Sequence, residues 1–325
     1  MFKLRFSLRT LVILLGLVAM SLAYVRQYTA HERLRNVLSR AVHLNPPPAK
    51  HSLLSCLFDH SHERIRHASF HGRERVNDAD MLQIARLSDL RRLSLYGAAI
   101  SDKSADSLAR HTNLETLSLE NCQITDKTMR AIAKLKRLKS LNLNGTLVTD
   151  KSIWYLVGLP KLAELKALNA RFSGRGVSRL GASKSLETIE LSATSPFSLS
   201  SSPALKSIRI YVSRLDEPVT IEYMPALEHA TIEVHRVVAD EPTGILISSA
   251  PKLKEVVILG AGADLSAAPS MESLFVIGNG AKFGDLGELP RLKLRSELPK
   301  LMKFRAIDVN ITPDSFQLLP AALKL

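Results

Sequence analysis

The stretch that decides the fold is LNLNGTLVTD, residues 141–150, because near copies of it recur at equal spacing. LSLENCQITD occupies residues 117–126, and LSLYGAAISD occupies residues 93–102. Five consecutive units, aligned on the leucine three positions before each phrase, begin 24 residues apart at Leu90, Leu114, Leu138, Leu162 and Leu186. A chain with this pattern is built from one small unit used repeatedly, and each unit needs a neighbour to bury its leucines.

Each unit combines the periodicity of a strand with that of a helix. Apolar residues three and five positions after the first leucine alternate as in a β-strand, and those at fifteen and eighteen share one face of a helix. In the quoted unit, Gly145 turns the chain, Val148 returns to the core, and Thr149 or Asp150 is predicted to cap the helix. The equivalent caps would be Ser101 or Asp102 and Thr125 or Asp126. We favour capping by these aspartates over a carboxylate row for calcium or acid–base catalysis.

Weaker units extend the array in both directions. One precedes the regular part, with Ile65, Ala68 and Phe70, and later units start at Leu205, Leu227, Leu253, Met271 and Leu301. The later spacings are irregular, and the connectors SPFSLSSSP (195–203) and GAGADLSAAPS (260–270) lack helical periodicity. We interpret FSLSSSP as a loop and GAGAD as a glycine turn. Eleven strands in one curved parallel sheet are therefore expected, joined in the second half by extended or 3₁₀ connectors.

The pattern LxxLxLxx(N/C), with Cys122 as a buried scaffold residue at the Asn/Cys position, identifies the chain as similar to leucine-rich repeat proteins. Together with the basic start RFSLRTL, an apolar span and the ITD/VTD phrases, the sequence resembles membrane-anchored bacterial leucine-rich repeat proteins of the planctomycete type. The resemblance implies an α/β horseshoe-shaped solenoid with a parallel concave sheet and helices on the convex side of the first half. It also implies a role in ligand binding or protein interaction, and it supplies no catalytic residues.

The N-terminal segment predicts attachment to a membrane. Residues 1–9 form a basic tail, and residues 10–25 carry no charge. As a helix this run would cover roughly 24 Å of the hydrocarbon core, as a transmembrane or signal-anchor segment. A cleaved signal peptide and a buried helix are the alternatives. Residues 26–50 are expected to be a helical stalk and proline linker, followed by regular repeats with a cap region (51–194) and irregular repeats (195–325). We expect a single-pass protein with its repeats on the extracytoplasmic side.

The solvated strand face is the predicted binding surface, because a parallel sheet covered by helices on one side exposes the other. Arg92 and Tyr96, with His67 and His71 on the preceding strand, have the composition of an interface hot spot. The remaining candidates are polar and occupy equivalent strand positions: Ser94, Thr116, Ser118, Glu120, Ser140, Asn142, Asn144, Glu164, Lys166, Thr188 and Glu190. The sequence thus predicts a non-enzymatic membrane-anchored module for a protein partner. The alternative is an element that binds carbohydrate or cell wall.

Other chemistries find little support in the sequence. It contains no GxSxG, HExxH, P-loop or GxGxxG motif, so we expect neither enzymatic activity nor a cofactor. Residues 56–71 are rich in metal-binding side chains, but their spacing matches no closed site, so no metal is expected; they are Cys56, Asp59, His60, His62, His67 and His71. The basic stretch 127–139 interleaves its charges with apolar residues at helical spacing. It therefore indicates a solvated helix face, and nucleic-acid binding is not expected.

Overall fold

The computed structural model describes most of the 325-residue chain. The described residues are 8–41, 43–45, 65–72, 76–237, 244–266, 268–278, 291–295, 297–307, 309–320 and 323. Over the residues whose side chains are described, no helix is both long and apolar enough to cross a membrane. Much of the predicted span, residues 10–25, lies outside those residues, and so do Cys56, Asp59, His60 and His62.

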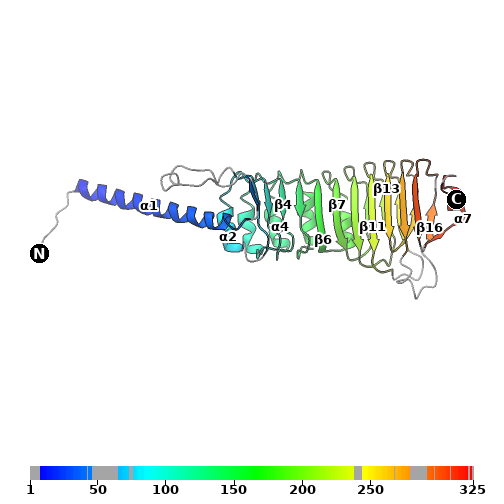
Figure 1. The fold of residues 1–325 in the computed structure, drawn as a ribbon, viewed down its shortest axis with the longest axis horizontal. Coiled ribbons are helices and arrows are strands. Elements are labelled where there is room, and N and C mark those ends of the chain that lie inside the picture. Colours follow the sequence, from blue (N-terminus) through cyan, green and yellow to red (C-terminus); the bar gives the residue numbers. More distant parts are fainter. Residues whose placement is uncertain are drawn as a thin grey trace.

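The molecule is a row of strands with one long helix, α1 (Leu8–Leu38), extending from its N-terminal end (Figure 1). Leu34, Val37 and Leu38, at the C-terminal end of this helix, are buried against the repeats. Arg40 then pairs with Asp80 of α2 (Asp78–Ile84), with Nη2 and Oδ1 2.7 Å apart. The end of the stalk is therefore part of the cap on the first repeat.

A sheet of twelve strands forms the spine of the molecule. The eleven strands predicted from the repeats are all present and pair in parallel, each with the next repeat. The twelfth, β1, lies inside the expected stalk and linker segment and pairs antiparallel with β2. In spatial order the strands are β1 (His43–Asn45), β2 (His67–Ser69), β3 (Arg92–Ser94), β4 (Thr116–Ser118), β5 (Ser140–Asn142), β6 (Glu164–Phe172), β7 (Thr188–Ala193), β9 (Ser207–Val212), β11 (His229–Val234), β13 (Glu255–Leu259), β15 (Ser273–Ile277) and β17 (Lys303–Ile307).

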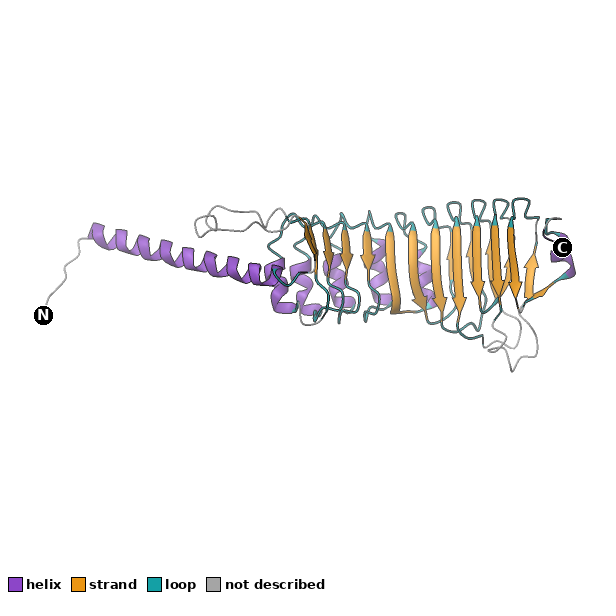
Figure 2. Cartoon of the chain, viewed as in Figure 1, coloured by secondary structure: helices purple, strands orange, loops and turns teal. Residues whose placement is uncertain are grey.

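Short helices cover the back of this sheet only in its first half (Figure 2). Besides α2 they are η3 (Asp102–Ser104) with α3 (Ala105–Leu108), α4 (Asp126–Ile132), η4 (Asp150–Ser152) with α5 (Ile153–Val157), and α6 (Gly174–Leu180). The predicted change from helices to extended connectors after the regular repeats is confirmed. A further helix, α7 (Pro313–Gln317), packs near the C-terminal end.

The connectors of the second half form a second parallel sheet, which the sequence analysis did not foresee. Its strands are β8 (Ser198–Ser200), β10 (Val219–Glu222), β12 (Gly244–Ser248), β14 (Gly262–Leu265), β16 (Arg291–Leu294) and β18 (Asn310–Ile311). The interpretation of FSLSSSP as a loop and GAGAD as a turn was therefore wrong, because β8 and β14 lie there. Paired with their neighbours, these short segments satisfy backbone groups that an isolated loop would leave to water.

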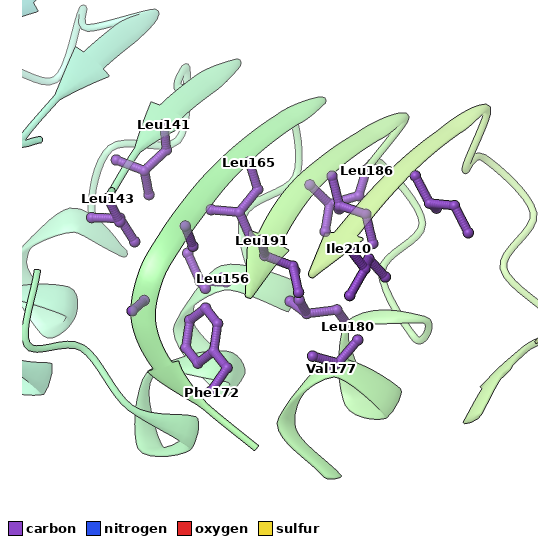
Figure 3. Close-up of a cluster of buried hydrophobic side chains, with 14 of the residues drawn as sticks. Leu141, Leu143, Leu156, Leu165, Phe172, Val177, Leu180, Leu186, Leu191 and Ile210 are labelled. Carbon is purple, nitrogen blue, oxygen red and sulfur yellow. The ribbon is translucent and has the colours of Figure 1, made fainter. Parts of the chain in front are cut away.

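The core is a continuous apolar column between the long sheet and the elements behind it, which are short helices in the first half and the second sheet in the second half. In Figure 3, Leu165 and Leu191 of the strands point toward Val177 and Leu180 of α6, with Phe172 beside them. All five side chains are at most 2% exposed. Each buried residue of this size contributes roughly 1.5–3 kcal/mol, so successive units stabilise one another through leucines that no unit could bury alone.

In each repeated Ser/Thr-Asp pair the two residues have different roles, although the sequence analysis expected either one to cap the helix. The Ser or Thr caps its own helix: the Thr125 side chain accepts a hydrogen bond from the Lys127 amide. The aspartate instead reaches the next repeat. Asp102 accepts hydrogen bonds from the Thr125 amide at 2.9 Å, from the Thr125 hydroxyl at 2.6 Å and from the Thr128 hydroxyl at 2.6 Å. The expectation that the aspartates cap their own helices was wrong for this geometric reason.

Asp78, Asp126 and Asp150 accept equivalent hydrogen bonds from the repeat after their own. The carboxylates therefore link the helical segment of each repeat to that of the next along the first half. Burial raises the pKa of Asp78 and Asp102, but the hydrogen bonds to each outweigh it and leave both pKa values below the ordinary 3.8. The row ends where Ser173 is followed by Gly174 instead of an aspartate. A Cβ on Gly174 would lie 1.5 Å from the Pro196 backbone oxygen, so the first extended connector packs directly on this glycine.

Candidate binding surface

The open face is defined here as the side of the twelve-stranded sheet that points away from the core. Strand residues alternate between buried and partly exposed along it, as in β7, where Ile189 and Leu191 are buried and Thr188 and Glu190 are not. All fifteen residues predicted to bind occupy open-face positions, and none of them is buried. Their placement agrees with the repeat register; their role as a binding site stays a proposal.

The predicted cluster of His67, His71, Arg92 and Tyr96 divides into two neighbouring pairs. Strand register places His67 beside Arg92. The rings of His71 and Tyr96 meet edge to face with centroids 5.8 Å apart. Tyr96 remains 43% exposed, so much of its ring is available to a partner. Aromatic pairs of this geometry are preferred contacts and hold both rings in place.

A hollow of about 300 Å³ lies between the first three parallel strands, β2 to β4. His67 and Arg92 line it together with four residues that carry hydroxyl groups: Ser69, Ser94, Thr116 and Ser118. Glu115, directly before Thr116 in the chain, accepts a hydrogen bond from Lys139 with Oε2 and Nζ 2.7 Å apart, and this hydrogen bond lowers the pKa of Glu115. The hollow therefore combines hydroxyl groups with two basic side chains.

The middle of the open face is occupied by contacts between the repeats themselves. Asn142 donates to Glu120 across 2.8 Å, and Ser140 donates to Glu164 across 2.7 Å. Asn144 accepts a hydrogen bond from the Leu168 amide at 2.7 Å. These predicted binding residues therefore also hold adjacent strands together, and a ligand would have to compete for their polar groups.

Charged side chains on the middle strands of the open face, β6 to β9, also form ion pairs with one another. Lys166 lies 3.5 Å from Glu164 and 3.6 Å from Glu190, and Arg209 lies 3.6 Å from Glu190. Such exposed pairs contribute little stability, but they neutralise the surface. Arg92 differs, because no carboxylate of the described residues lies within ion-pair distance of it. The N-terminal end of the open face thus offers a cation with no ion-pair partner among the described residues.

The described groups do not assemble into a catalytic or metal-binding arrangement. The Ser69 hydroxyl lies 2.9 Å from Nε2 of His71, but within the described chain no carboxylate bonds the other ring nitrogen to orient it. No cluster of three His, Cys, Asp or Glu residues with metal-binding geometry occurs among the described residues. Cys122 is buried as predicted: its thiol donates to the Leu95 oxygen, and burial raises its pKa to about 12. The described surface is suited to binding through shape and charge.

The sequence analysis missed an apolar block on the last three strands of the open face. Outward positions that are polar on earlier strands are here Val257, Leu259, Phe275, Ile277 and Ile307. The signal was present in the runs EVVIL and SLFVI, which are apolar on both strand faces. These strands lie in the irregular repeats, where the 24-residue register does not give the outward positions.

Comparison with known proteins gives remote structural similarity only. No protein-family model and no curated protein matches the chain. An internalin (inlF) from Listeria monocytogenes is 16% identical over 73% of this chain and 81% of its own, with a TM-score of 0.39. A leucine-rich repeat protein from Leptospira interrogans is 13% identical over 88% and 95%, with a TM-score of 0.33. The plant peptide hormone receptor RGFR1, in complex with RGF2, is 15% identical over 73% and 47%, with a TM-score of 0.39.

These similarities are too low to support a functional argument, and the fold rests on the chain's own geometry. Each repeat adds one parallel strand and a set of buried apolar residues, and in the regular 24-residue units of the first half it also adds one short helix. The chain is a leucine-rich repeat solenoid whose second half exchanges helices for a second parallel sheet.

Proposed function

We propose that this protein is a non-enzymatic interaction module that binds a protein partner through the N-terminal end of its open face. The observation that carries the proposal is Arg92, which has no ion-pair partner among the described residues, at a hollow lined by hydroxyl groups and on the same strand segment as the exposed Tyr96. Arginine and tyrosine dominate binding energy at interfaces because they combine large contact area with directed polar groups. A partner segment would place an anionic group at Arg92 and a flat apolar group on Tyr96.

The test removes both anchors and follows the partners in intact membranes. A photo-crosslinking residue at Ser118, inside the hollow, should capture one main partner, and Arg92→Ala with Tyr96→Ala should reduce its yield about tenfold or more. The matched control is Arg175→Ala with Trp154→Ala, which removes an exposed arginine and an exposed aromatic from helices on the opposite side. An unchanged set of captured proteins in the first variant would refute the proposal.

The carbohydrate alternative is not favoured by the described surface. Sugar sites rely on aromatic platforms, and on the open face of β2 to β7 Tyr96 is the one Phe, Trp or Tyr side chain within the described residues.

We further propose that the N-terminal half of α1 anchors the protein in a membrane, with the repeats on the extracytoplasmic side. Two observations support the anchor: residues 10–25 carry no charge, and Val18, Met20, Leu22 and Val25 are each at least 50% exposed. Apolar side chains on several sides of a helix are unfavourable in water and stable in lipid.

An alkaline carbonate wash of isolated membranes should leave the intact chain in the pellet. A chain lacking residues 1–25 should be released into the supernatant. Release of the intact chain would contradict the anchor. Protease added to sealed vesicles then reports topology, because only repeats outside the vesicle are cut.

A further inference from the structure

The apolar block lies at the end of the long sheet where β17 is the last described strand. Strand register places Val257 beside Phe275, and Leu259 beside Ile277 and then Ile307. Neighbouring strands are about 4.8 Å apart, so these five side chains form one contiguous patch. All five are partly exposed, and contiguous apolar patches on otherwise polar surfaces are typical of interaction sites. On the rest of the open face the corresponding rows are mostly polar and paired.

The outer edge of β17 carries backbone groups that face away from the sheet. The Lys303 amide donates to Glu272, and the Ile307 oxygen accepts from the Gly278 amide, so the odd-numbered residues bond to β15. In a parallel ladder the intervening residues, Phe304 and Ala306, turn their amide and carbonyl groups the other way. No described strand pairs with that side, and β17 is the last strand of the sheet. Such an edge accepts an additional strand.

The same strand carries two cations on its open face. Lys303 and Arg305 are exposed, and no described carboxylate lies within ion-pair distance of either. This contrasts with Lys166 and Arg209 in the middle of the sheet, which are paired across strands. The chemistry that complements this edge is therefore anionic beside the two cations and apolar beside Ile307.

We propose that β17 binds an extended acidic segment of another polypeptide, which adds to the sheet as a thirteenth strand. A second copy of this chain fits poorly, because antiparallel pairing of two β17 strands about Arg305 places the two arginines opposite each other. Like charges directly opposite in a strand pair are destabilising. The acidic residues of the added strand would instead form favourable cross-strand pairs with Lys303 and Arg305. An apolar residue opposite Ile307 would extend the apolar block.

The register specifies the side chains of the bound segment. Residues opposite Lys303 and Arg305 are acidic, and the residue opposite Ile307 is apolar. Those opposite Phe304 and Ala306 point toward the core side, where both of these residues are only partly buried, and are apolar. The parallel sequence is thus Glu-Val-Glu-Val-Val, and the antiparallel one is its reverse.

The test titrates fluorescein-labelled ten-residue peptides that contain either sequence with the full-length chain, purified in mild detergent, by fluorescence anisotropy. One of them should bind, and replacing its glutamates by lysines should weaken binding about tenfold or more. Lys303→Glu with Arg305→Glu should invert this preference. Lys161→Glu with Lys184→Glu, an equal charge change at exposed turns, should not alter it.

Methylation of the peptide amides separates strand pairing from simple charge attraction. Methyl groups on one alternate set of amides should abolish binding, and those on the other set should leave it intact, because only one set faces β17. Equal effects of both sets would overturn the proposal, as would glutamate-peptide binding that survives the charge reversal. Arg92→Ala with Tyr96→Ala should leave peptide binding unchanged. The proposal for β17 is therefore tested independently of the proposed partner site at β2 to β4.

Discussion

Replacing His111 by leucine should stabilise the protein, and increasingly so in mild acid. His111 occupies the position where Leu87, Leu135 and Leu159 stand in the neighbouring units, each 24 residues apart. Its side chain is buried in the core, with Nδ1 donating to the Leu87 oxygen at 3.3 Å. Its Nε2 has no partner among the described residues. An unsatisfied buried polar atom costs about 1–3 kcal/mol, so His111→Leu gains that amount of stability. The substitution also loses the hydrogen bond to Leu87, which offsets about 1 kcal/mol of the gain.

The pH dependence follows from the same burial. Burial lowers the pKa of His111 from 6.5 to about 4, although the Leu87 hydrogen bond opposes this. The unfolded chain therefore binds a proton that the folded chain excludes as pH falls from 6.5 to about 4. Stability should fall by about 1.4 kcal/mol per pH unit across that window, or about 3 kcal/mol in all. Above the window the histidine is neutral in both states and adds no dependence.

The assay is urea denaturation at several pH values, comparing the unaltered chain with His111→Leu. The difference between their unfolding free energies should be about 1 kcal/mol near pH 7 and should grow to about 3–4 kcal/mol near pH 4.5. The matched control is His235→Leu, the same substitution at an exposed histidine, whose profile should follow the unaltered chain. Parallel profiles for the unaltered chain and His111→Leu would refute the view that the ring is buried and neutral.

Four further substitutions test the scaffold, and the urea midpoint at constant slope measures the stability of each variant. Asp102→Ala should cost about 2–3 kcal/mol at pH 7, because two threonine hydroxyls and an amide lose a charged acceptor. Since the pKa of Asp102 is lowered in the folded chain, this loss should shrink as pH falls from 3.8 toward that lowered pKa, because the unfolded chain there binds a proton that the folded chain excludes. Gly174→Ala should cost more than about 3 kcal/mol, because its Cβ meets a backbone oxygen at 1.5 Å. Leu141→Ala, in the fully buried ladder, should cost about 2–5 kcal/mol, whereas Trp154→Ala, at 73% exposure, should change stability by less than about 0.5 kcal/mol. Similar costs for the last two would contradict the assignment of the core.

The sequence predicted the strands well because their signal is periodic and local. Leu141 and Leu143 alternate with polar residues in one short phrase, and the phrase recurs in register. All eleven predicted strands occur in one sheet for that reason. The helical covering of the first half followed from the spacing of Met129 and Ile132 in the same way. The role of the aspartates did not follow, because their hydrogen-bond partners lie in the next unit and only stacking brings them together.

The candidate site was predicted in its composition and only partly in its geometry. The alternation of strand residues placed Arg92 and Tyr96 on the open face, and register alone could have paired His71 with Tyr96. That Asn142 and Glu120 would satisfy each other could not be deduced, because it depends on side-chain conformations across strands.

The sequence by itself determined the repeat, the strand face of the leucines that recur in the regular units, and the point where helices give way to extended connectors. These are properties of a single unit and its period. Only the tertiary structure decided that the late connectors pair into a second sheet and that β17 is the last described strand of the long sheet. It also decided which charges form ion pairs across strands, as Lys166 does, and which, like Arg92 and Arg305, have no ion-pair partner among the described residues. Those features depend on what lies beside each strand in space, and a 24-residue period contains no information about a neighbour that departs from it.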